Sequence, residues 1–190
     1  MNQNRISQYL ESRRERLQLL EAMWNDPKVQ LYNDVELPPK DDAPSVFLNG
    51  PTSRHQILEF NHRCLSVKYL RDAGFSGWIY APEPRGHEEP GAFTERGYIH
   101  EWESSRRFSA SCNSFWIPRD SNELLGLNSN LELGIDIGKL LAGTKNHRVF
   151  IGWPDQALRM GLPNHYRKLT GLTLYRNQQV MCEQIALLVK

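Results

Sequence analysis

Short apolar segments alternate with amphipathic segments over most of this chain, and this alternation limits the possible folds most strongly. The apolar segments are only a few residues long and several end at Gly or Pro, which is typical of buried strands. The expected strands cover residues 45–49, 75–80, 113–117, 148–151 and 172–175. The expected helices cover residues 57–72, 95–109, 130–142, 155–169 (interrupted near Pro163) and 178–189. This order predicts an α/β fold with helices on both faces of a parallel sheet.

The first 44 residues follow a different pattern. Residues 6–24 carry apolar side chains at helical spacing among charges of both signs, which predicts an amphipathic helix. Residues 25–44 are rich in Pro and contain a short acidic run, which is typical of a linker or a surface strap. We therefore expect a helical extension and linker at 1–44 and one domain at 45–190.

The composition favours a small-molecule partner. The formal net charge of +1 shows no basic excess of the kind that long nucleic acids require. Cys64, Cys112 and Cys182 match no zinc or redox spacing, and the His residues show no ligand spacing, so we expect reduced thiols, no metal and no other cofactor. No apolar run has the length of a membrane span or of a signal peptide core, so we expect a cytoplasmic protein without a membrane partner.

The ligand site is expected where the strands end. In a doubly wound sheet, ligands bind beyond the carboxyl ends of the strands, at the point where the strand order reverses. Three loops are expected at that edge, at 49–54, 81–94 and 118–129. The second loop is polar and rich in Pro and Gly, and we interpret it as a lid over the site.

One acidic residue, Glu132, follows the third loop at the expected start of a helix. Residues 129–132 match the S-x-x-E capping box, in which Glu132 only bonds back to the cap backbone. The alternative is catalysis, because a helix N-terminus favours an ionised carboxylate, and such a carboxylate can attack an anomeric carbon. The fragment alone leaves both readings open.

Four segments, in order, resemble the nucleoside 2-deoxyribosyltransferase family. Residues 46–51 (VFLNGP) resemble an opening strand and loop with an aromatic residue, a Leu, a small residue and then Gly-Pro. Trp102-Glu103 with 115–119 (FWIPR) is similar to a pair of motifs in one branch of the family. Residues 129–134 (SNLELG) resemble that branch's T-N-x-E-x-G signature, and 150–154 (FIGWP) resemble its I-G-x-P strand.

This resemblance implies a flavodoxin-like doubly wound domain that acts on 2-deoxynucleosides or nucleotides. The reaction it implies is transfer of the sugar to another base, or to water. Glu132 is then the nucleophile, Asn130 orients it or contacts the sugar, and Glu103 is the acid/base. The resemblance also implies a homo-oligomer.

The expected substrate contacts lie in the first and third loops. Thr52 or Ser53 could instead only cap a helix. Arg54 could instead lie on the surface, and Trp116 could instead pack in the core. Trp102 is expected in the core, and stacking on the base is its alternative role. The full set of expected contacts is Asn49, Gly50, Pro51, Thr52, Ser53, Arg54, Trp116, Pro118, Asn128, Ser129 and Asn130.

The chain departs from the family pattern at three places. Ser111 stands where relatives often have Asp, so an acidic group is absent at this position. Phe47 stands where many relatives have Tyr, so the tyrosine hydroxyl is absent there. Residues 124–127 lack an Asp that some relatives carry before the nucleophile. Two alternatives therefore stay open: a non-catalytic nucleotide-binding module, and a hydrolase of another N-glycoside such as a ribonucleotide or a dinucleotide.

Overall fold

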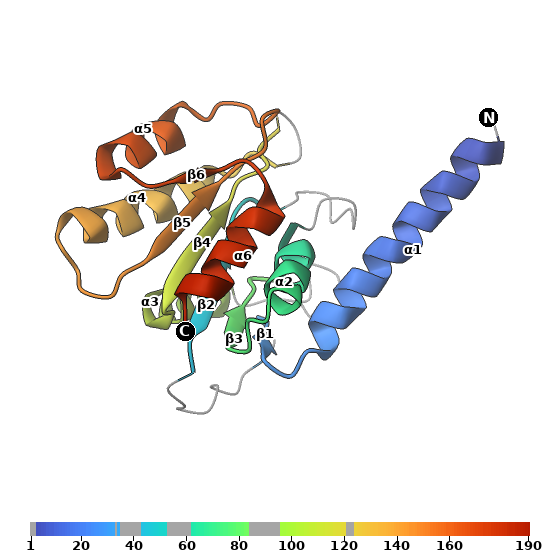
Figure 1. The fold of residues 1–190 in the computed structure, drawn as a ribbon, viewed down its shortest axis with the longest axis horizontal. Coiled ribbons are helices and arrows are strands. Elements are labelled where there is room, and N and C mark those ends of the chain that lie inside the picture. Colours follow the sequence, from blue (N-terminus) through green and yellow to red (C-terminus); the bar gives the residue numbers. More distant parts are fainter. Residues whose placement is uncertain (1–2, 33, 35–42, 53–61, 84–95, 121–123) are drawn as a thin grey trace.

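A single all-parallel sheet organises the computed structural model, which describes residues 3–32, 34, 43–52, 62–83, 96–120 and 124–190 (Figure 1). Within these residues the strands lie in the order β1-β3-β2-β4-β5-β6. The strands are β1 (Val29–Gln30), β2 (Ser45–Asn49), β3 (Trp78–Tyr80), β4 (Cys112–Trp116), β5 (Val149–Gly152) and β6 (Leu174–Tyr175). The helices are α1 (Gln3–Asn25), α2 (His62–Asp72), α3 (Arg96–Ser109), α4 (Leu127–Leu141), α5 (Gly161–Thr170) and α6 (Gln178–Leu188).

The strand order confirms the predicted fold class. Strands β3-β2-β4-β5-β6 follow the flavodoxin-like order, in which the chain winds to one side of its first core strand and then to the other. The direction of winding therefore reverses between β2 and β4, which are hydrogen-bonded neighbours. This reversal leaves a crevice at the carboxyl ends of β2 and β4, where no crossover connection covers the sheet edge.

Alternating side chains of the strands build a core on each face of the sheet. Val46 and Leu48 of β2 pack into the cluster that α1, α2 and α6 complete, whereas Phe47 packs with Trp102 of α3 on the opposite face. Helices α4 and α5 pack against each other, and Leu133 of α4 lies in a third cluster with residues of β4 and β5. The three cysteines are free and buried.

The N-terminal segment is part of the sheet and of the core. Strand β1 pairs in parallel with β3 at the sheet edge, and it lies in a segment where the sequence predicted only a linker. Leu20 and Met23 of α1 are buried in the same cluster as the α2 and α6 side chains. The residues before and after the expected domain boundary at residue 45 therefore contribute side chains to one hydrophobic core.

Helices α4 and α5 begin at residues several positions away from those expected. Helix α4 begins at Leu127 instead of residue 130, because Gly126 takes the left-handed conformation (φ 58°) at the N-cap. Helix α5 begins at Gly161 instead of residue 155, so the expected helix at 155–160 was wrong. Pro163 lies in the first turn of α5, where its missing N–H breaks no helical hydrogen bond, and it does not interrupt the helix.

Two further features expected from the sequence are the lid over the site and the absence of a membrane-spanning helix. The lid predicted at 81–94 falls almost wholly outside the described residues. No helix within the described part of the chain combines the length and the apolar character needed to span a membrane.

Replacing Leu20 by Ala tests whether α1 belongs to the core. Leu20 is 3% exposed, so its truncation leaves a cavity, and we expect the free energy of unfolding to fall by about 2–4 kcal/mol. Leu187→Ala on α6 is the matched control: it also truncates a helical leucine, but one that is 57% exposed, and it should cost less than about 1 kcal/mol. Denaturant unfolding measures both values. Equal, small losses in the two variants would show that α1 is an independent appendage.

Candidate active site

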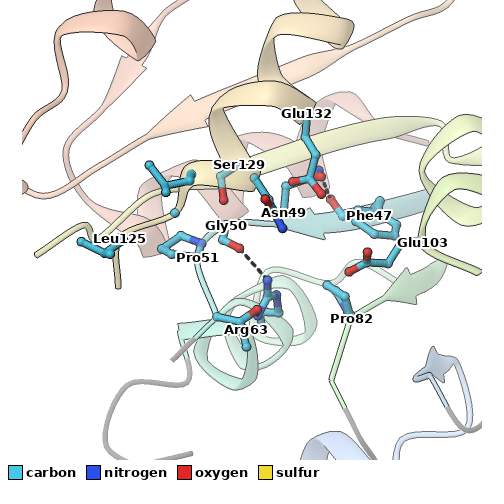
Figure 2. A pocket seen from close by; sticks show the side chains of 14 residues that line it. Phe47, Asn49, Gly50, Pro51, Arg63, Pro82, Glu103, Leu125, Ser129 and Glu132 are labelled. Atoms are coloured by element: carbon cyan, nitrogen blue, oxygen red, sulfur yellow. Dashed lines mark hydrogen bonds between the residues drawn. The ribbon is translucent and has the colours of Figure 1, made fainter. Parts of the chain in front are cut away.

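A cavity of about 260 Å³ lies at the carboxyl ends of β2 and β4, where the strand order reverses (Figure 2). A ribose with its base is of a size that such a crevice can take up in large part. Its wall is built by five parts of the chain: the end of β2 with its turn, the segment after β3, and helices α2, α3 and α4. The lining residues are Phe47, Asn49, Gly50, Pro51, Thr52, Arg63, Pro82, Glu103, Leu125, Gly126, Leu127, Asn128, Ser129 and Glu132.

Glu132 reaches the cavity from the second turn of α4. Because α4 begins at Leu127, the expected position of Glu132 in the first turn was wrong. The capping box is also absent, since the N-cap is Gly126 and no side chain caps this helix. Glu132 therefore faces the cavity with its carboxyl group, as Figure 2 shows.

The protonation of Glu132 differs from the sequence expectation. Burial, followed by the negative charge of Glu103, raises the pKa of Glu132 from 4.5 to about 7. The positive charges of Arg107 and Arg63 oppose this effect but do not cancel it. The helix N-terminus was expected to keep the carboxylate ionised, but one further turn of helix separates the two and the macrodipole acts mainly within the first turn.

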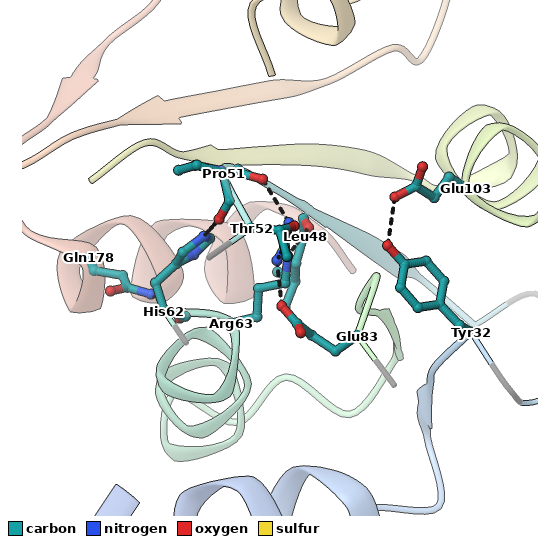
Figure 3. Close-up of polar contacts among 10 residues, drawn as sticks. Tyr32, Leu48, Pro51, Thr52, His62, Arg63, Glu83, Glu103 and Gln178 are labelled. Carbon is teal, nitrogen blue, oxygen red and sulfur yellow. Dashed lines mark hydrogen bonds and ion pairs between the residues drawn. The ribbon is translucent and has the colours of Figure 1, made fainter. Parts of the chain in front are cut away.

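The second carboxylate, Glu103, projects from α3 toward the same cavity. The Tyr32 hydroxyl donates a hydrogen bond to Oε1 of Glu103 at 2.9 Å, as Figure 3 shows. The Tyr32 ring packs edge-on against Trp102 with 5.4 Å between centroids, and Trp102 is buried at 5% exposure, as its core role predicted. Burial and the charge of Glu103 raise the pKa of Tyr32, so the hydroxyl keeps the proton that it donates.

Sequence reasoning missed Tyr32 because residue 32 lay in the supposed linker. The resemblance places a tyrosine hydroxyl near the nucleophile at position 47, where the chain has Phe. In the structure Phe47 lines the cavity with an apolar ring, and a tyrosine hydroxyl reaches Glu103 from the segment after β1 instead.

Arg63 of α2 joins two of the loops that line the cavity (Figure 3). Its guanidinium donates to the carbonyls of Leu48 at 3.1 Å and Gly50 at 2.7 Å, and to the Thr52 hydroxyl at 3.3 Å. It also forms an ion pair with Glu83, which follows β3. Arg63 is 3% exposed, and a planar guanidinium with several donors suits such a role. No sequence motif marked it, because its contacts depend on the tertiary fold.

Gly50 allows β2 and β4 to approach each other at the cavity edge. Its φ of +143° lies in a region that side chains rarely adopt, and a Cβ atom at this position would lie 2.3 Å from the Trp116 carbonyl oxygen and 2.6 Å from His62. His62 in turn contacts the Pro51 carbonyl through Nε2 at 3.1 Å. Burial and the charge of Arg63 lower the pKa of His62 to about 3, so this imidazole is neutral and Nε2 donates the hydrogen bond.

The expected substrate contacts fall into three groups. Six of them line the cavity: Asn49, Gly50, Pro51, Thr52, Asn128 and Ser129. Ser53 and Arg54 lie outside the described residues. The third group, Trp116, Pro118 and Asn130, is not part of the cavity wall within the described chain.

Two members of the third group have structural contacts. Trp116 packs in the core, where its ring approaches Gly152 so closely that no side chain fits there. Asn130 accepts a hydrogen bond from Arg119 at 2.7 Å, and the same guanidinium donates to the Gly126 carbonyl at 3.0 Å. Asn130 therefore helps to hold the start of α4 and does not reach the cavity.

The family departure at Ser111 has no bearing on this cavity. Ser111 precedes β4 and accepts a hydrogen bond from the Ser45 amide, so it lies at the amino ends of the strands. At about 3.3 Å per residue, the length of β4 separates it from the cavity. An acidic side chain at this position would not contact a ligand bound between β2 and β4.

The cavity contains carboxylates but no metal-binding cluster. Among the described residues, no group of three or more His, Cys, Asp or Glu side chains is arranged to hold a metal ion. No protein-family model and no curated protein matches this chain.

Replacing Glu132 by Gln should stabilise the protein at high pH. The pKa of Glu132 is 4.5 ordinarily and about 7 in the folded protein, so the folded state binds the proton more tightly and loses stability as pH rises through 7. At about 1.4 kcal/mol per pH unit, the neutral Gln should raise the free energy of unfolding at pH 8 by up to roughly 3 kcal/mol, and by less at pH 5.

Urea unfolding at pH 5 and pH 8 measures this effect. Glu103→Gln serves as a second variant: it removes a charge that raises the pKa of Glu132, so it should reduce the stability that is lost between the two pH values. An equal or lower stability of Glu132→Gln at pH 8 would contradict the assigned burial of the carboxylate.

Proposed function

We propose that this protein cleaves the N-glycosidic bond of a nucleoside or nucleotide through a covalent glycosyl ester on Glu132. The sugar then passes to another base or to water. One observation carries the proposal: Glu132 and Glu103 line the same cavity at the reversal of the strand order. Glycosidases that retain configuration use two carboxyl groups in this way, one as nucleophile and one as acid/base. The expectations of a cytoplasmic location and of a homo-oligomer belong to the same proposal.

The segments that carry the family resemblance support this assignment. Asn49, Gly50 and Pro51 come from the first segment, Glu103 from the second, and Ser129 with Glu132 from the third. These residues are far apart in the sequence, and they line one cavity. The fourth segment, at 150–154, contributes no residue to the described cavity wall.

The first chemical step forms the ester. A carboxylate oxygen of Glu132 attacks C1 of the sugar, the bond from C1 to the base nitrogen breaks, and its electron pair leaves with the base. Glu103 supplies the proton that the departing base takes up. The step therefore requires an ionised Glu132 and a proton on Glu103. With a pKa of about 7 beside the charged Glu103, Glu132 is partly protonated at neutral pH, and transfer of this proton from Glu132 to Glu103 produces the reactive form.

The second step releases the sugar. An acceptor base or a water molecule attacks C1, and Glu103, now a carboxylate, takes the acceptor's proton. The ester bond breaks, and Glu132 leaves as a carboxylate. The hydrogen bond from Tyr32 fixes the position of Glu103 through both steps.

A panel of nucleosides and nucleotides, incubated with and without an acceptor base, tests the proposal. We expect free base from at least one substrate, and a new nucleoside when a suitable acceptor is present. Glu132→Gln should lower kcat at least about a thousandfold, because it removes the nucleophile. Glu103→Gln should lower it by about 10²–10⁴, because it removes the acid/base. Liquid chromatography of base and nucleoside measures all rates.

Glu101→Gln is the matched control, since Glu101 lies on the same helix as Glu103 but is exposed and does not line the cavity. It should keep the activity of the unaltered protein. Unchanged base release by Glu132→Gln would refute the proposed nucleophile. Nucleotide binding without base release by the unaltered protein would favour the binding-module alternative.

A further inference from the structure

We propose that the first turn of α4 binds a phosphate group on the 5′-carbon of the sugar, so that the substrates of this site are 5′-nucleotides and not nucleosides. The unpaired N–H groups of this turn, the Ser129 hydroxyl and the charge of Arg119 carry the inference. It rests on the proposed function and narrows the substrate class that this function leaves open.

The first observation is a set of unpaired N–H groups at the start of α4. Leu127, Asn128 and Ser129 form the first turn of this helix, and all three line the cavity. Their N–H groups have no acceptor within the helix and none elsewhere among the described residues. Gly126 at the N-cap has no side chain that could accept from them. A helix N-terminus that opens into a cavity favours an anion, because the N–H donors and the macrodipole act together.

The second observation is the Ser129 hydroxyl, which points into the same cavity. Ser129 is 2% exposed, and its hydroxyl has no hydrogen-bond partner in the described part of the chain. Its oxygen borders the cavity (Figure 2) and is not sealed from it, in contrast to the unpartnered Oδ1 atoms of Asn49 and Asn113. Its partner therefore has to come from the contents of the cavity. Together with the N–H groups of its own turn, this O–H donates to an acceptor-rich group such as phosphate.

The third observation is a buried positive charge beside this turn. Arg119 is 5% exposed. Its guanidinium donates to the Gly126 carbonyl at 3.0 Å, the Asn130 Oδ1 atom at 2.7 Å and the Arg159 carbonyl at 3.0 Å. These acceptors are neutral, and Arg119 forms no ion pair with any carboxylate among the described residues. Since a guanidinium stays charged in a protein, an anion at this turn supplies the missing counter-charge.

The hydroxyl and the charge lie close to the same point of the cavity wall. Gly126 lines the cavity, and the Ser129 Oγ and Arg119 Nη2 atoms each lie 3.5 Å from the point that a Cβ atom of Gly126 would occupy. The missing side chain at this residue leaves the first turn of α4 open to a ligand. Arg119 does not line the cavity itself, so it acts on the ligand through its charge.

The position of this turn relative to the nucleophile favours a 5′-phosphate. Glu132 follows Leu127 by five positions on α4, which corresponds to roughly 7 Å along the helix axis. Figure 2 shows Leu125, which precedes this turn, and Glu103 at opposite ends of the cavity, so an anion at the turn is held away from that carboxylate. In a 5′-nucleotide the ring oxygen, C4 and C5 separate C1 from the phosphate. One molecule can therefore present C1 to Glu132 and its phosphate to the start of α4.

Ser66 of α2 offers a matched control for Ser129. It is also a helical serine with 2% exposure, but it does not line the cavity. Its hydroxyl accepts a hydrogen bond from Gln178 at 2.8 Å. Ser66→Ala therefore removes a buried hydroxyl and leaves the proposed phosphate site intact. Ser129→Ala removes one donor of that site and keeps a residue that favours the helix.

The experiment compares a nucleoside with its 5′-monophosphate and its 3′-monophosphate, all with the same base and sugar. We expect the unaltered protein to cleave the 5′-monophosphate with a kcat/KM at least about a hundredfold above that of the nucleoside, because several donors meet only this phosphate. Ser129→Ala should reduce this preference by roughly tenfold. Ser66→Ala should leave the preference unchanged, and thermal melting checks that each variant is folded.

Binding measured without turnover separates the two proposals. Calorimetric titration of Glu132→Gln with the three compounds and with inorganic phosphate reports the phosphate preference whether or not the protein is an enzyme. Absence of base release from every compound refutes the proposed function, but tighter 5′-monophosphate binding that Ser129→Ala weakens still supports the phosphate site.

Three results would overturn the phosphate site and leave the proposed function standing. One is equal binding and cleavage of the nucleoside and its 5′-monophosphate. Another is an equal gain in affinity from the 3′-phosphate, which would show a general attraction of anions instead of a placed 5′-phosphate. The third is inorganic phosphate that binds as tightly as the 5′-monophosphate, which would show a site for the free anion.

Discussion

The Glu132 carboxyl lies in a cavity where both burial and the negative charge of Glu103 oppose its ionisation. A folded protein keeps such a group only if the surrounding structure holds it there, because the charged form costs stability. Structural ion pairs usually combine opposite charges, whereas this pair combines two acids. Two carboxyl groups in one cavity, one of them with a pKa raised to about 7, are the groups that nucleophilic and acid/base chemistry at a sugar requires.

The fold positions this pair through backbone geometry. Because the chain winds in opposite directions from β2 and β4, their carboxyl ends are left open, and α4 begins at this opening directly after Gly126. Arg63 holds the β2 turn and the segment after β3 together, and Gly50 permits their close packing against β4. The N-terminal segment completes the arrangement, since Tyr32, in the segment after β1, donates a hydrogen bond to Glu103 from a region that the sequence placed in a linker.

The sequence predicted those parts of the structure that depend on local patterns. The alternation of apolar and amphipathic segments was sufficient to predict the α/β class. The expected ends of the strands were sufficient to predict that Asn49, Thr52 and Ser129 lie at one edge of the sheet. Strand β1 was missed because a two-residue strand has no periodicity of its own. The start of α4 was misplaced because its N-cap, Gly126, has no capping side chain that could be recognised in the sequence.

The same distinction explains the candidate site. Glu132 and Glu103 could be predicted from short motifs, whereas Arg63 and Tyr32 are defined by contacts between elements distant in the sequence. The sign of the pKa change at Glu132 was also inaccessible, because it depends on burial and on the distance to Glu103. Asn130 lies two residues before Glu132 in the same motif, but the helix turns it toward Arg119.

Mass spectrometry of the acid-quenched, digested protein tests the central claim most directly. The protein is mixed with an excess of a cleavable nucleoside, and the reaction is stopped during turnover. The account predicts a peptide that gains one pentosyl group, with fragmentation placing the group on Glu132. Steady turnover with no pentosyl-bearing peptide, or with the group on any other residue, would contradict it.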